Sequence, residues 1–196
     1  MAAGELKAEF GRKAIHLLIA LVPTLAAVPQ IGRSHIALLL MGGILFYTAA
    51  ESMRFLGFQL PLISSVTAAV LREREQGRFA LAPVTLGLGA LLALILFPPQ
   101  AAAAAIYALA FGDSAACLIG KSLGRIRPAF LTGKSIEGSI ACFAASALAG
   151  YLVFHDWKIA AAIGAASMIV DSLPIKDFDN LFLPLAAGLA AMLMSK

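Results

Sequence analysis

Charged residues are scarce in this chain. Of its 196 residues only 13% are Asp, Glu, Lys or Arg, whereas 61% are hydrophobic; a soluble domain carries about 25% charged residues. This composition excludes an ordinary soluble domain and predicts a single membrane-embedded domain over residues 1–196. Because the bilayer core offers backbone groups no water, apolar runs of this kind are expected to be helices. The predicted fold class is an all-α, polytopic membrane bundle.

Cysteine is scarcer still, with two residues in the chain. Cys117 and Cys142 both lie in apolar runs, without the CxxC or Cys/His spacing of a zinc site and with no support for a disulfide. They are expected to be small apolar packing residues.

The net charge of +4 does not indicate nucleic-acid binding, because the cations lie in loops where membrane topology explains them. The mixed charges of the N-terminus favour a retained helix over a cleaved signal peptide.

Seven apolar runs are predicted to span the membrane. They are residues 14–30, 34–50, 81–97, 101–120, 138–154, 159–175 and 180–194. Residues 56–70 are apolar but contain Pro61, Ser64 and Ser65, and they are predicted to be interfacial or re-entrant. With this count most Lys and Arg residues lie on the side of the N-terminus, which the positive-inside rule makes cytoplasmic. We therefore expect an integral protein of a plasma membrane or endomembrane.

Acidic side chains stand at two unusual places. Asp113 lies roughly 12 Å inside its predicted helix, at 1.5 Å per residue, and acids at such depth usually face a polar cavity; the alternative is a structural ion pair. Asp171 lies near the same membrane face, and Asp177, Asp179 and Asn180 follow it. Carboxylate and amide oxygens suit Mg²⁺, which usually takes one or two carboxylates plus substrate phosphates. A solvated turn is the alternative for Asp177 and Asp179.

The loop between the fourth and fifth runs is the candidate phosphate site. It holds Lys121, Arg125, Arg127, Lys134 and Glu137, together with Gly120, Gly124 and Gly133. Glycines allow close backbone approach and exposed amides can form anion nests, while the start of the next helix offers N-terminal amides. The loop is not a Walker A motif, because Pro128 occupies the position of its first glycine. The cations could instead be topology signals alone, but Glu137 adds nothing to such a signal.

A polar stripe enters the first run. Glu5, Glu9, Arg12 and His16 are spaced by four, three and four residues and so share one helical face. His16 is a candidate general base or phosphate contact, because imidazole titrates near neutral pH. The alternative is an interfacial histidine that contacts Arg12.

Several motifs together resemble one enzyme family. GDSAACLIGKSLGR at 112–125 followed by GKSIEGS at 133–139 resembles the core of the CTP-dependent lipid kinases, which act on dolichol, phytol or diacylglycerol. FGRKAIHL at 10–17 resembles the family's entry to the first helix, and DNLFLPLAAG at 179–188 resembles the start of its final helix. The long Asp-rich signature of the related phosphatidate cytidylyltransferases is absent, which favours the kinase branch.

The resemblance implies a site around a nucleotide and a metal ion. It places Asp113, Lys121, Lys134, Ser135 and Glu137 there, with Asp179 and Asn180 nearby and Arg12, Lys13 and His16 at the border. One position departs from the family pattern, because Asp171 stands where a glutamate is expected and its side chain has a shorter reach.

The leading hypothesis is a kinase that transfers the γ-phosphoryl group of CTP to a membrane lipid alcohol. Asp113, helped by Asp171 or Asp179, is expected to hold Mg²⁺; Lys121, Lys134 and Arg125 are expected to neutralise phosphate oxygens beside Gly133. One carboxylate, or His16, would orient or deprotonate the hydroxyl. Two alternatives stay open: cytidylyl transfer to a lipid phosphate, and a small ion-coupled transporter.

Overall fold

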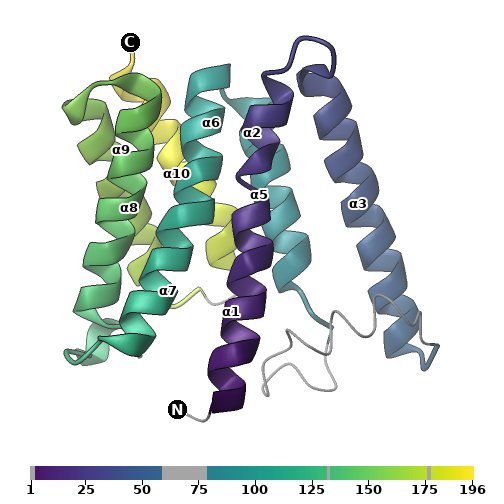
Figure 1. Cartoon of the computed structure of the whole chain (residues 1–196), viewed down its shortest axis with the longest axis horizontal. Helices are drawn as coiled ribbons and strands as arrows, with labels where there is room; N and C mark the ends of the chain where they lie inside the picture. Colours follow the sequence, from purple (N-terminus) through teal and green to yellow (C-terminus); the bar gives the residue numbers. More distant parts are fainter. Residues whose placement is uncertain (1–2, 59–78, 132, 176–177) are drawn as a thin grey trace.

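The computed structural model describes residues 3–58, 79–131, 133–175 and 178–196. Every regular element in these ranges is a helix, so the prediction of an all-helical fold is confirmed for them. The helices run roughly along one direction, with the two chain termini at opposite ends of the bundle (Figure 1). They are α1 (Ala3–Leu18), α2 (Leu21–Ala26), α3 (Gly32–Phe55), α5 (Ala82–Leu96), α6 (Pro99–Tyr107), α7 (Asp113–Ser122), α8 (Ile136–Phe154), α9 (Trp157–Ser172) and α10 (Asp179–Met194).

Local sequence explains several helix ends. Proline stands in the first turn of both α5 and α6, where its missing N–H has no helical partner to lose. Ser135 caps α8 by accepting the Gly138 N–H at 3.1 Å, and Asp156 caps α9 through the amides of its first turn. These four helices therefore begin within two residues of the starts of the corresponding predicted runs.

The first predicted run, 14–30, is not one continuous helix, because α1 ends at Leu18 and the short α2 follows. The run 101–120 is broken differently. A five-residue π-helix, η2 (Ala108–Gly112), joins α6 to α7. Such wider turns are rare and frequently occur at functional sites. Asp113 is the first residue after it.

In the part of the chain that the structure describes, three helical stretches are long and apolar enough to cross a membrane: Gly32–Phe55, Pro99–Ser122 (α6, η2 and α7 together) and Ile136–Phe154. The helices Ala82–Leu96 and Asp179–Met194 are apolar but shorter. A membrane protein with three candidate spans is thus supported, and the seven-span arrangement stays a prediction. Of the segment 56–70, residues 59–70 lie outside the described residues.

Polar and apolar side chains are distributed as expected in lipid. Large apolar side chains on α3 are exposed, with Leu39 at 70% and Leu45 at 64%. Charged side chains of α1, α7 and α9 are buried instead, including Lys13, Asp113 and Asp171. A water-soluble surface rarely carries such contiguous apolar patches, whereas charges inside a membrane protein face its interior.

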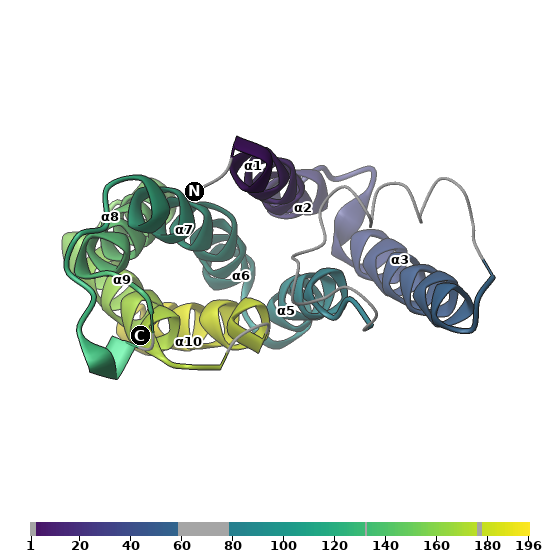
Figure 2. The ribbon, with the colours of Figure 1, turned by 90° about the horizontal axis from the view of Figure 1, so that it is seen from below.

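Helices α6 to α10 form the main group, and α5 lies between α10 and α3 at its edge (Figure 2). The centre of the group is packed with alanines of α6 and η2 that are almost fully buried, such as Ala104, Ala105 and Ala108. Small residues let helix backbones approach closely without a water-driven hydrophobic effect. The first helix lies against η2 and α7, and this contact brings its polar stripe to Asp113.

Candidate functional site

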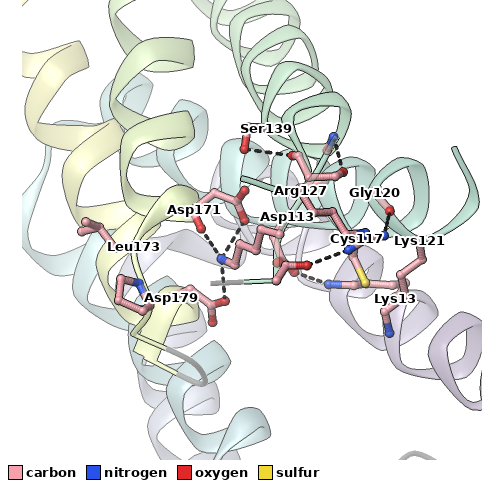
Figure 3. A pocket seen from close by; sticks show the side chains of 16 residues that line it. Lys13, Asp113, Cys117, Gly120, Lys121, Arg127, Ser139, Asp171, Leu173 and Asp179 are labelled. Carbon is pink, nitrogen blue, oxygen red and sulfur yellow. Dashed lines mark hydrogen bonds and ion pairs between the residues drawn. The ribbon is translucent and has the colours of Figure 1, made fainter. Parts of the chain in front are cut away.

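One cavity of about 680 Å³ gathers most of the predicted site residues. Its lining contains four basic side chains (Lys13, Lys121, Arg127, Lys134) and three acidic ones (Asp113, Asp171, Asp179), with Gly120, Gly133, Ser135 and Cys117 among the others. Figure 3 shows the three aspartates reaching the cavity from α7, α9 and α10. Charges of both signs in one concave site are what a metal-bound polyphosphate requires.

Asp113 is held by two side chains of α1. Its carboxylate forms an ion pair with Lys13, and His16 Nδ1 lies 3.0 Å from Asp113 Oδ2. All three residues are at most 8% exposed. The prediction of a functional acid and its alternative, a structural ion pair, are therefore both compatible with the geometry: Asp113 is paired, and it faces the cavity.

Asp171 and Asp179 share one cation. Lys134 Nζ donates to the backbone carbonyl of Asp171 and lies 3.2 Å from its Oδ1, while Asp179 Oδ2 is 3.8 Å away. The end of α9, the start of α10 and the residue before the α8 cap thus converge on a single ammonium group.

The described residues contain no group of three or more His, Cys, Asp or Glu side chains that could hold a metal ion by themselves. Mg²⁺ usually needs only one or two carboxylates when phosphate oxygens complete its shell. Asp171 and Asp179 could supply these two carboxylates, because both lie close to the same cation, the Lys134 ammonium group.

A residue that was not predicted as part of the site, Glu9, anchors α1 to α7. Its buried carboxylate pairs with Arg12 and with Lys121, and it accepts a hydrogen bond from Cys117 Sγ at 2.8 Å. Burial disfavours its charged form, but the Cys117 and Lys121 hydrogen bonds and the Arg12 charge outweigh this effect and lower the pKa of Glu9 to about 2. The polar stripe in the sequence contained Glu9 but did not show its partner helix.

The lowered pKa of Glu9 predicts a pH dependence of stability. A carboxyl group whose pKa falls from 4.5 to about 2 on folding contributes stability that is present above pH 4.5 and is lost as pH falls toward 2. We expect Glu9→Gln to lower the melting temperature at pH 7 and by the same amount at pH 5. The difference from the wild type should shrink below pH 4.5. Thermal unfolding in detergent measures the two melting temperatures. A difference between wild type and variant that grows on acidification would contradict the role of Glu9.

Glu137 and Arg125 organise the loop rather than line the cavity. Glu137 Oε1 accepts the backbone N–H groups of Arg125 at 2.9 Å and Ile126 at 3.2 Å, and the Ile136 N–H donates to the Ile126 carbonyl at 3.0 Å. The Arg125 side chain is exposed. Neither residue belongs to the cavity lining. The structure therefore does not bring Glu137, expected around the nucleotide and metal, or Arg125, expected to bind phosphate, to the aspartates.

Two further predicted residues point elsewhere. The Asn180 amide donates to the Ala82 carbonyl and to Thr85 Oγ1, both at 3.4 Å, so it joins α10 to α5. Arg12 is buried against Glu9. Of the acidic turn, Asp177 lies outside the described residues. The cavity is also lined by Arg127, Cys117 and Ser139, for which the sequence had indicated only loop charge, packing or membership of a motif.

Glycines allow α7 and α8 to cross closely beneath the cavity. A Cβ atom at Gly138 would lie 2.8 Å from the Ala116 carbonyl oxygen and 3.1 Å from Gly120 Cα. We expect Gly138→Ala to destabilise the protein by about 1 to 3 kcal/mol, as overpacking does. Gly43→Ala, at a position with nothing within 4 Å, is the matched control on α3 and should be neutral or slightly stabilising. Thermal unfolding in detergent distinguishes the two, and equal melting temperatures would contradict the close crossing.

Over the described residues, the fold and site together define an all-helical protein with three candidate membrane-spanning stretches and a charged cavity. The chain is 31% identical over 128 residues to an uncharacterized protein of Methanocaldococcus jannaschii. The match covers 65% of this chain and 64% of the relative, so the chain spans somewhat less than two thirds of that protein's length. No family model matches the chain, and no solved structure matches it.

Proposed function

We propose that this protein is a lipid-alcohol kinase that transfers the γ-phosphoryl group of CTP to a membrane lipid hydroxyl. The observation that carries the proposal is the cavity itself, in which four cations and three carboxylates meet inside a bundle with an apolar exterior. Cations suit the triphosphate and carboxylates suit its metal ion, while the apolar exterior suits a lipid acceptor. The choice of CTP rests on the motif resemblance alone.

The lysines are the proposed phosphate ligands. Lys13, Lys121 and Lys134 each pair with a carboxylate in the structure, and phosphate oxygens would compete for the same ammonium groups. Phosphoryl transfer needs positioning and charge neutralisation above all. Three ammonium groups on different elements can contact a triphosphate from several sides.

Magnesium fits the site through Asp171 and Asp179, whose oxygens both reach the Lys134 ammonium. When bound, Mg²⁺ would neutralise phosphate charge and leave the phosphorus atom more open to attack. Asp113, on α7, is proposed to orient the acceptor hydroxyl, and His16 stays beside its carboxylate when Lys13 binds phosphate.

The proposed reaction forms one bond and breaks one. The lipid hydroxyl oxygen bonds to the γ-phosphorus, the bond from that phosphorus to the β–γ bridging oxygen breaks, and CDP leaves. The hydroxyl proton passes to the Asp113–His16 pair. Acid–base assistance of this kind contributes about 10² to 10⁴ in rate.

The test is a phosphoryl-transfer assay with purified protein in lipid, Mg²⁺ and a panel of polyprenol, phytol and diacylglycerol acceptors. CTP labelled at the γ-phosphorus should label the lipid, and ATP, GTP and UTP should label it less. Transfer of α-labelled phosphorus to a lipid phosphate would instead establish cytidylyl transfer. Cation flux in proteoliposomes without any nucleotide turnover would establish a transporter.

A further inference from the structure

The sequence Gly-Lys-Ser occurs at both ends of the cavity loop. One copy, 120–122, ends α7, and the other, 133–135, leads into α8. In the structure both lysines line the cavity, although they are separated by the whole loop. A contact that fixes the distance between the two copies would therefore fix the distance between two cations.

Arg127 makes this contact. Its guanidinium donates from Nη1 to the Gly133 carbonyl at 2.6 Å and from Nη2 to the Gly120 carbonyl at 2.7 Å. Figure 3 shows the Arg127 side chain reaching Gly120 beside the cavity. One side chain thus binds the carbonyl of the glycine that precedes each lysine.

The serines of the two copies do not share a function. Ser122 Oγ donates to the Leu118 carbonyl at 2.6 Å within α7, whereas Ser135 Oγ caps α8. What the copies have in common is a lysine in the cavity and a glycine carbonyl bound to Arg127. Gly133 also has φ of +92°, a backbone conformation that residues with a Cβ rarely adopt, and this conformation presents its carbonyl to the arginine.

We propose that Arg127 is a positioning residue that sets the separation of Lys121 and Lys134, and so matches the cavity to two neighbouring phosphate groups. The inference rests on the proposed function, because it takes the two lysines as phosphate ligands. Guanidinium suits the task because it is planar and always charged, and its donors form a rigid fork that can bind two acceptors at once. A lysine ammonium carries the same charge without the fork.

Geometry and charge make different predictions for two substitutions. If Arg127 positions the lysines, Arg127→Lys and Arg127→Met both lose the bridge and both weaken phosphate binding. If Arg127 acts only through its charge on the phosphates, Arg127→Lys stays close to the wild type and Arg127→Met alone weakens binding. The matched control is Arg125→Met, which removes an exposed arginine of the same loop that is outside the cavity lining.

The experiment measures inorganic pyrophosphate binding to the full chain in detergent by calorimetry, beside CTP kinetics in lipid. We expect the Kd for pyrophosphate to rise about tenfold in both Arg127 variants, in line with the loss of charge-assisted hydrogen bonds, and to be unchanged in Arg125→Met. The KM for CTP should rise in parallel while kcat changes little, which a general loss of folding would not produce. If Arg127→Met does not fold, Arg127→Lys and Arg127→Gln carry the comparison.

Wild-type affinity in Arg127→Lys would overturn the proposal, as would equal weakening by Arg125→Met or no pyrophosphate binding by the wild type. A wild-type protein that binds pyrophosphate with the expected pattern but does not phosphorylate lipids would leave the positioning role standing and would overturn the proposed kinase activity.

Discussion

Replacing Asp113 with asparagine is expected to lower the rate of phosphoryl transfer by about 10² to 10⁴, the range typical of a positioned acid–base group. Asparagine keeps the shape of the side chain but cannot accept the hydroxyl proton or pair with Lys13 and His16. The measurement is kcat with CTP and the best lipid acceptor. Asp156→Asn is the matched control, since Asp156 caps α9 and asparagine caps a helix about as well.

The same substitution should also destabilise the protein, because it leaves Lys13 buried without its counter-ion. Breaking a buried ion pair costs about 3 to 5 kcal/mol. The double variant Lys13→Met, Asp113→Asn removes both charges and should recover much of the melting temperature without recovering activity. An active double variant would show that Asp113 has only a structural role, and it would contradict the proposed reaction.

Lys134→Met should have the second large effect, a fall in kcat/KM for CTP of about 10- to 100-fold, because a hydrogen bond to a charged group is worth about 1.5 to 3 kcal/mol. Lys134 is the only cation that the described structure places against both Asp171 and Asp179. Its loss removes a phosphate ligand and leaves two carboxylates facing each other. Methionine preserves most of the side-chain length, so the effect reports the charge.

The control for this variant is Lys158→Met, an exposed lysine in the first turn of α9, which lies outside the cavity lining. It should leave kcat/KM unchanged. Raising the salt concentration should reduce the difference between the wild type and Lys134→Met only slightly, because a half-buried charge is screened less than an exposed one. A loss of activity in both lysine variants would indicate that general surface charge, rather than the site, binds the nucleotide.

The helical membrane class could be predicted from the sequence because it depends on composition and run length alone. Backbone groups without water must bond within a helix, so the runs around residues 34–50, 101–120 and 138–154 had to be helical. The position of Asp113 within an apolar run also follows from counting residues. For the same reason the sequence could place the Lys121–Glu137 loop directly between two helices.

The tertiary structure alone decided which side chains meet. Glu9 binds α7, Glu137 binds the backbone of its own loop, and Asn180 points to α5. The direction of each side chain depends on how its helix is rotated and where it crosses its neighbour. Close glycine contacts, such as Gly138 against Ala116, set the crossing of α7 and α8. Spacing along one chain segment carries no information about a partner about 100 residues away, such as Lys13 for Asp113.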